Sequence, residues 1–84
     1  MFYTYVLFYS DSHDKTYTGF TSDLQKRLNA HNDDRNSGWT KNFRPWRIVY
    51  YETYENKKDA MNRERELKSA RGRDFIKNKL LPGI

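Results

Sequence analysis

An acidic residue interrupts an apolar helical stripe in the second half of this 84-residue sequence. Ala60, Met61 and Leu67 form the stripe, and at ~100° per residue Glu64 falls between Ala60 and Leu67. A carboxylate on an inward-facing helix surface is unfavourable unless it is paired or binds a cation. Two interpretations stay open: Glu64 binds a metal ion, or it reaches solvent or a salt bridge with one of the many nearby Arg and Lys residues.

A guanidinium and an imidazole lie one helical turn apart earlier in the sequence. Arg27 and His31 would share one helical face, beside Leu24 and Leu28. A guanidinium can bind a phosphate through two parallel hydrogen bonds, and an imidazole can orient or shuttle a proton near neutral pH. The alternative is a surface arginine and a helix-ending histidine that interacts with the helix dipole.

Two tyrosines complete the set of chemically useful groups. Tyr5 and Tyr17 precede the Arg27 segment. A phenol can donate or accept a hydrogen bond, or act as a base when neighbouring cations lower its pKa. Most tyrosines in strands serve packing instead, and each of the two taken alone fits that ordinary role better.

These groups need a scaffold, and the sequence first predicts a β-hairpin. From Phe2 to Tyr9 almost every residue is aromatic or β-branched, and Lys15 to Phe20 is a second predicted strand after about five turn residues. Period-two alternation divides the first strand into two faces. One face carries Phe2, Thr4, Val6 and Phe8, and the other carries Tyr3, Tyr5, Leu7 and Tyr9.

The rest of the sequence predicts helices around one more strand. Ser22 and Gln25 form a capping-box pattern for a helix to about His31, followed by a polar loop over residues 32–44. Pro45 begins a strand over residues 46–54. Asn56 is a suitable N-cap for a helix that runs to about Ala70. Gly72 interrupts the helical pattern, and a short helix spans residues 73–80. The order β-β-α-β-α-α predicts a single α+β domain over residues 1–84, with an antiparallel sheet covered by helices.

Charge and composition favour a polyanionic partner. Sixteen Lys and Arg residues against eleven Asp and Glu residues give a net charge of +5 and a pI near 9.6. Such an excess attracts nucleic acid, and a merely soluble charged surface explains it equally well. Cysteine is absent, which excludes disulfides and thiolate metal sites. No stretch approaches the ~20 apolar residues of a membrane helix, so we expect a cytoplasmic protein that does not bind membranes.

Together these residues resemble the GIY-YIG nuclease superfamily over nearly the whole chain. The family's Gly-Ile-Tyr triplet would fall on Tyr3-Thr4-Tyr5, and its Tyr-Ile-Gly triplet on Tyr17-Thr18-Gly19, with Arg27 eight residues after the glycine. Residues 19–32, 44–52 and 60–68 also follow the family's pattern. The first triplet lacks its glycine and both isoleucines are threonines here, whereas the tyrosines and Gly19 remain.

The resemblance implies a three-stranded antiparallel sheet flanked by helices, with one active site on the sheet face. Carried over position by position, it gives a catalytic set of Tyr5, Tyr17, Arg27, His31 and Glu64. Glu64 would be the lone protein ligand of one Mg²⁺ or Mn²⁺ ion, with water and phosphate oxygens completing the octahedron. The carboxylate that helical periodicity singles out is therefore the residue that this family uses for metal.

The resemblance also implies a chemical role for each member of the catalytic set and for the metal. Arg27 would stabilise charge on the phosphoryl oxygens, and the metal would stabilise the leaving oxygen as a Lewis acid. Either Tyr17, polarised by neighbouring cations, or Tyr5, hydrogen-bonded to His31, would take the proton from the attacking water. The sequence leaves this choice open.

The expected substrate is nucleic acid, DNA or RNA. Family members with known targets carry further domains that choose the site. We therefore expect structure-selective or weakly specific cleavage in DNA repair or recombination, or a partner protein that supplies specificity. Trp39 could stack on a base or pack against the sheet, with packing slightly favoured. Phosphate contacts without base preference are expected from Lys41, Arg44, Arg63, Lys68, Arg71, Arg73 and Lys77.

A second hypothesis belongs to a different class of function. The chain could be a nucleic-acid-binding module that keeps the fold and cuts little without a partner protein. The intact set of candidate residues favours the nuclease, and the short chain favours the module. A small basic domain with a structural role is the third alternative, and the order of the motifs disfavours it.

Overall fold

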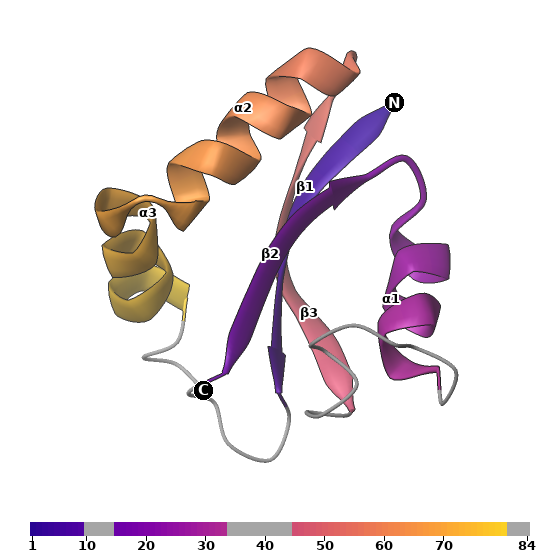
Figure 1. Cartoon of the computed structure of the whole chain (residues 1–84), viewed down its shortest axis with the longest axis horizontal. Helices are drawn as coiled ribbons and strands as arrows, with labels where there is room; N and C mark the ends of the chain where they lie inside the picture. The colour runs from indigo at the N-terminus through magenta and orange to yellow at the C-terminus, as the bar shows by residue number, and fades with distance from the viewer. Residues whose placement is uncertain (10–14, 34–44, 81–84) are drawn as a thin grey trace.

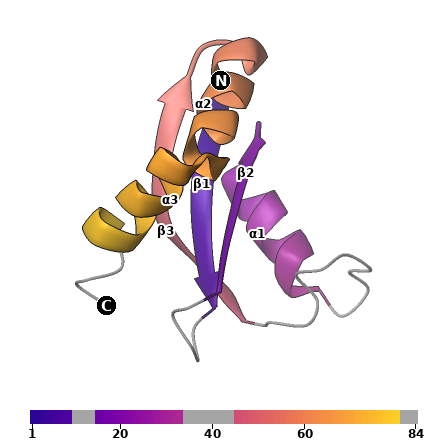
Figure 2. The ribbon, with the colours of Figure 1, turned by 60° about the vertical axis from the view of Figure 1, so that its left-hand side comes forward.

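A three-stranded antiparallel sheet forms the centre of the computed structural model, which describes residues 1–9, 15–33 and 45–80. Strands β1 (Phe2–Tyr9), β2 (Thr16–Thr21) and β3 (Trp46–Tyr54) lie in the order β2-β1-β3, so β1 is central. Helix α1 (Leu24–Asn32) covers one face of the sheet (Figure 1). Helices α2 (Lys57–Lys68) and α3 (Ala70–Phe75) cover the other, and a π-helical turn, η2 (Ile76–Leu80), continues α3. The turned view in Figure 2 shows the same three layers, and the predicted order and α+β class are confirmed.

The central strand supplies both hydrophobic cores because its side chains alternate between the two faces. Tyr5 and Leu7 pack with Trp46 on the α1 side, whereas Val6 packs with Leu67 and Ile76 on the other. This division agrees with the period-two prediction for β1. The buried Thr4 hydroxyl is satisfied because it donates to the Ala60 carbonyl at 2.7 Å, which also joins β1 to α2.

Helix α1 begins one residue later than the capping-box pattern predicts. Its N-cap is Asp23, whose side chain accepts from the Lys26 amide at 3.0 Å, so the prediction of Ser22 as the cap was wrong. The Asp23 amide in turn donates to the Thr21 hydroxyl at 3.1 Å, which forms a turn between β2 and α1. At the other end, the Asn32 side chain accepts from the Trp46 amide at 2.6 Å and fixes α1 against the start of β3.

The break between α2 and α3 falls at Ser69 instead of Gly72. The Ser69 backbone is extended. Its hydroxyl donates to the Glu66 carbonyl at 2.5 Å and accepts from the Gly72 amide at 3.2 Å. One serine therefore ends α2 and caps α3, so the predicted interruption at Gly72 and helix start at Arg73 were wrong. Gly72 lies inside α3, pressed against the last turn of α2.

Replacing Gly72 by alanine should lower the free energy of unfolding by roughly 1–3 kcal/mol or more. An added Cβ would lie 2.2 Å from the Glu66 carbonyl oxygen and 2.3 Å from the Leu67 Cα, and both are backbone atoms that cannot turn aside. Urea unfolding followed by circular dichroism measures the change. Arg71→Ala, at the exposed neighbouring position, is the control and should leave stability within about 0.5 kcal/mol of the parent.

Candidate active site

The Tyr5 hydroxyl on β1 is held by two side chains from α1. It lies 3.1 Å from the His31 Nε2 atom, and the Arg27 Nε atom donates to it at 3.3 Å. Because a guanidinium nitrogen can only donate, the Tyr5 oxygen accepts that bond. In the neutral His31 tautomer whose Nε2 carries no proton, the Tyr5 hydroxyl donates to that nitrogen. The contact is buried, since Tyr5 is 1% exposed and His31 is 5% exposed.

Tyr17 on β2 completes a group that we call the tyrosine cluster, made of Tyr5, Tyr17, Arg27 and His31. The Tyr17 ring centroid lies 4.6 Å from that of His31 and 6.4 Å from that of Tyr5. Hydrogen bonds to Tyr5 and then to Tyr17 raise the pKa of the Arg27 guanidinium, so the cation serves both phenols. Unlike Tyr5, Tyr17 is only partly buried.

Gly19 lies directly opposite Tyr5 in the β1–β2 pairing, and its missing side chain makes room for the cluster. A Cβ at this position would lie 2.7 Å from the Tyr5 hydroxyl oxygen and 3.1 Å from a ring carbon of Tyr17. Any other residue would therefore displace the Tyr5 phenol from its partners. This close approach is the physical reason for glycine at the end of the second triplet.

Burial sets the protonation states in the cluster. Desolvation raises the pKa of Tyr5 to about 12, against the opposing effects of the Arg27 hydrogen bond and charge. Desolvation, followed by the positive charge of Arg27, lowers the pKa of His31 to about 4. Near neutral pH the site therefore contains a protonated phenol and a neutral imidazole, in agreement with the directed Tyr5–His31 hydrogen bond.

The low pKa of His31 predicts loss of stability in mild acid. Unfolding restores the ordinary pKa of 6.5, so below that pH the unfolded chain takes up a proton that the folded chain binds only near pH 4. The free energy of unfolding should therefore fall by about 2 kcal/mol between pH 7 and pH 5 through this residue alone. Urea titrations at both pH values measure the fall. His31→Gln should remove this component, and an equal pH dependence in the two proteins would contradict the assignment.

Glu64 lies on the inward side of α2, as the helical periodicity predicts. Ala60 and Leu67 on either side of it are buried, and the Glu64 side chain is 20% exposed. Its charge is among the causes that raise the pKa of Tyr5, so the carboxylate lies within electrostatic range of the tyrosine cluster. The salt-bridge interpretation holds in part, because Lys68 Nζ lies 3.8 Å from Glu64 Oε1, a long contact to a half-exposed lysine.

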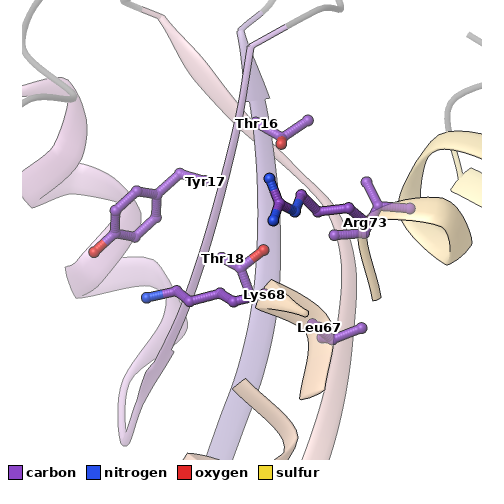
Figure 3. A pocket seen from close by; sticks show the side chains of 7 residues that line it. Thr16, Tyr17, Thr18, Leu67, Lys68 and Arg73 are labelled. Atoms are coloured by element: carbon purple, nitrogen blue, oxygen red, sulfur yellow. The ribbon is translucent and has the colours of Figure 1, made fainter. Parts of the chain in front are cut away.

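A pocket of about 400 Å³ joins α2 and α3 to the edge strand β2. Figure 3 shows Tyr17 on one side of β2, with the cationic side chains of Lys68 and Arg73 entering from α2 and α3. Tyr17 and Lys68 line this pocket together, so side chains of α2 and the tyrosine cluster meet at the β2 edge. The lining residues are Thr16, Tyr17, Thr18, Leu67, Lys68, Arg73 and Ile76.

Glu64 is the carboxylate that could hold a divalent cation beside the cluster. It offers hard oxygen atoms of the kind that Mg²⁺ and Mn²⁺ prefer, and its side chain is largely shielded from solvent. Over residues 1–9, 15–33 and 45–80, no three His, Asp or Glu side chains gather into a metal-binding group.

The structure brings together only part of the predicted phosphate-binding set. Lys68 and Arg73 share the β2-edge pocket, whereas Arg71 borders a separate hollow at the α2–α3 break and Lys77 is exposed on η2. Arg63 donates through Nε and Nη2 to both Glu52 carboxylate oxygens, at 2.9 and 3.2 Å, and through Nη1 to Glu66 at 3.2 Å. A guanidinium used in this way is a weaker candidate for a phosphate. Three predicted residues lie outside the described part of the chain: Trp39, Lys41 and Arg44.

A polar network between β3 and α2 was not predicted from the sequence. Glu52 accepts hydrogen bonds from the Tyr50 and Tyr54 hydroxyls as well as from Arg63. Burial alone would raise the pKa of Glu52, but these hydrogen bonds and the Arg63 charge outweigh it and lower the pKa. The signal was present, because residues at spacing two on a strand share a face. The network holds α2, and with it Glu64, against the sheet.

The sequence and the fold both match those of known proteins. Residues 1–79 match a family model described as the GIY-YIG catalytic domain. A UPF0213 protein of Clostridium perfringens is 40% identical over 68 residues, which cover 81% of this chain and 71% of that protein. A UPF0213 protein of Haloquadratum walsbyi is 33% identical over 67 residues, covering 80% and 75%. The solution structure of a UPF0213 protein from Bacillus halodurans is 30% identical, with a TM-score of 0.54 over 99% of this chain and 90% of that one.

None of the helices in the described ranges combines the length and the hydropathy needed to cross a bilayer.

Proposed function

This chain belongs to the GIY-YIG catalytic domain family, and from that membership we propose that it is an endonuclease that hydrolyses nucleic-acid phosphodiester bonds with one divalent metal ion. The observation that carries the proposal is the Tyr5 hydroxyl, held by Arg27 and His31 beside the Tyr17 ring. Three consecutive elements, β1, β2 and α1, direct a cation, an imidazole and two phenols to one place. Glu64 on a fourth element lies within electrostatic range of them.

Arg27 is proposed to bind the reacting phosphate. Its Nε atom is used on Tyr5, which orients the guanidinium, and its terminal nitrogens can donate to phosphoryl oxygens. Because the negative charge on these oxygens grows as water attacks, a fixed cation stabilises the transition state more than the ground state. Arg27 is therefore both a binding and a catalytic residue.

Tyr17 is the preferred proton acceptor in the proposal. Burial raises the pKa of Tyr5 to about 12, which makes loss of its proton unfavourable, and its oxygen and proton are already used on Arg27 and His31. Tyr17 is partly exposed, shares the Arg27 cation and borders the pocket that Lys68 and Arg73 enter. In this scheme Tyr17 first gives its own proton to solvent, and the resulting phenolate beside Arg27 takes the proton of the attacking water. Tyr5, itself hydrogen-bonded to His31, holds Arg27 in place.

Glu64 is the proposed metal-holding residue. A divalent ion bound there would supply Lewis-acid stabilisation of the phosphate and the leaving oxygen. The carboxylate itself is suited to this role because α2 is fixed on the sheet by the Thr4–Ala60 hydrogen bond and by the Glu52–Arg63 ion pair. Its largely buried position also limits competition from solvent.

Substrate choice is proposed to be structure-selective or weakly specific, with a role in DNA repair or recombination. Arginine and lysine side chains near the site are suited to backbone phosphates, which carry no sequence information. Such contacts favour recognition of nucleic-acid shape, and a partner protein would then supply any target sequence.

The proposal is tested by incubating the purified chain with branched, flapped and plasmid DNA and with structured RNA, in Mg²⁺ or Mn²⁺. We expect nicking that depends on the metal and stops in EDTA. Salt-sensitive binding without cutting across this panel would overturn the nuclease proposal in favour of the nucleic-acid-binding module.

The two tyrosines should respond differently to removal of the hydroxyl. Tyr17→Phe should lower the single-turnover cleavage rate by about 10²–10⁴, the usual contribution of a general base. Tyr5→Phe should slow cleavage less, and it should lower the free energy of unfolding by about 1–3 kcal/mol because it removes the hydrogen bonds that join the buried Tyr5 hydroxyl to His31 and Arg27. Rates measured against pH and urea unfolding separate the two effects. A larger rate loss in Tyr5→Phe would reverse the assignment.

A further inference from the structure

We propose that Thr16, Thr18, Lys68 and Arg73 form a second phosphate subsite, which binds a backbone phosphate next to the one that is cut. The inference rests on the proposed function, which makes the bound polymer a nucleic-acid strand. The subsite uses different side chains from the tyrosine cluster. The substrate would then lie across the edge of β2.

The first support is the way in which the four side chains converge. Thr16 and Thr18 alternate with Tyr17 on β2, so their hydroxyls lie on the opposite face of the strand from its ring. All four line the β2-edge pocket, and Figure 3 shows the Arg73 guanidinium reaching from α3 toward the two threonines. Two cations and two hydroxyl donors around one hollow match the several oxygens of a phosphate.

The second support is that the positive charge of the pocket is at most weakly paired with carboxylates. Across the described ranges, no carboxylate forms a salt bridge with Arg73. Lys68 has a single contact of 3.8 Å to Glu64 with half of its side chain exposed, so it can turn to an anion with little loss. Arg63, on the neighbouring turn of α2, is by contrast fully paired. Lys68 and Arg73 therefore remain available to an anion at the β2-edge pocket.

The third support is the floor of the pocket. Leu67 and Ile76 are 1% and 4% exposed and form its apolar base. An apolar wall lowers the local dielectric, which strengthens hydrogen bonds between the cations and a bound phosphate. A nucleic-acid strand anchored at this pocket would also pass Tyr17, which lines the pocket and contacts His31 of the tyrosine cluster.

The test measures binding apart from cleavage. In a Glu64→Gln background with EDTA present to prevent cutting, fluorescence anisotropy follows binding of a labelled DNA hairpin with a single-stranded flap at several salt concentrations. Arg73→Ala should weaken binding about tenfold and reduce the slope of log affinity against log salt by about 0.7–0.9, the value for one lost phosphate contact. The double variant Thr16→Val with Thr18→Val should weaken binding about threefold with an unchanged slope, because a hydroxyl releases no counterion.

Arg65→Ala is the matched control, since Arg65 is exposed on α2 and lies outside the pocket. It removes the same charge and should change neither affinity nor slope appreciably. The subsite is overturned if Arg73→Ala and Arg65→Ala have equal affinities and slopes, or if Arg73→Ala weakens binding only in proportion to a loss of folded protein seen by circular dichroism.

Failure of the subsite and failure of the nuclease proposal can be distinguished. Cleavage by the parent chain with no effect of Arg73→Ala on binding rejects the subsite and retains the nuclease. Weakened binding in Arg73→Ala with no cleavage by the parent chain supports the phosphate subsite and rejects the nuclease.

Discussion

Replacing Glu64 by glutamine is expected to lower the rate of metal-dependent cleavage by about a thousandfold, which corresponds to about 4 kcal/mol of transition-state stabilisation. The change keeps the size of the side chain and removes the charge that would hold the divalent ion. Within the described ranges, Glu64 forms one long ion pair, with the half-exposed Lys68 at 3.8 Å, so the fold should remain intact. Single-turnover cleavage at saturating Mg²⁺ or Mn²⁺ measures the effect, and thermal unfolding confirms that the protein is folded.

Glu66→Gln provides the matched comparison on the same helix. The Glu66 side chain is 65% exposed and contacts Arg63, on the side of α2 away from the β2-edge pocket. We expect its cleavage rate to stay within about twofold of the parent. A Glu64→Gln protein that kept more than a tenth of the parent rate would remove Glu64 from the metal-binding role.

Replacing Arg27 by alanine is expected to lower the cleavage rate by about 10²–10³. The guanidinium is held to Tyr5 at 3.3 Å and serves Tyr17 as well, so its loss removes the phosphate-binding cation and releases both phenols. Arg27→Lys should recover only part of the activity, because an ammonium keeps the charge but lacks the planar fork. Comparing kcat with KM for the two variants separates loss of transition-state stabilisation from loss of substrate binding.

The effect of Arg27→Ala can also be measured in the protein without substrate. The positive charge of Arg27 is the second cause of the lowered pKa of His31, so Arg27→Ala should raise that pKa toward its ordinary value. NMR titration of the His31 ring measures this directly. An unchanged imidazole pKa together with unchanged cleavage would show that Arg27 does not act at the cluster.

The hairpin and the third strand were predictable because their side-chain patterns are local. Strands β1 and β3 have the predicted bounds, and the division of β1 between two cores follows from alternation alone. The helix ends were less predictable, because several polar residues compete for the same free amide groups. Asp23 caps α1 where Ser22 was predicted to do so. Ser69 ends α2 three residues before Gly72, where the interruption was expected.

The candidate site shows the same distinction. The types and order of Tyr5, Tyr17, Arg27 and His31 sufficed to nominate a group of residues, and helical periodicity singled out Glu64. Their contacts could not be predicted, since β-pairing and helix docking set them. The sequence also treated the cations as equivalent, whereas packing pairs Arg63 with Glu52 and leaves Arg73 facing the β2 edge.

The sequence by itself therefore determined the element order, the two faces of the central strand and the residues able to do chemistry. These depend on propensities and periodicities that act within a few residues. Only the tertiary structure decided that Tyr5 is a buried, protonated phenol between Arg27 and His31 and that Tyr17 is the accessible one. Burial and long-range contact change the pKa of a side chain and its partners, and both depend on groups that the fold brings from distant parts of the chain.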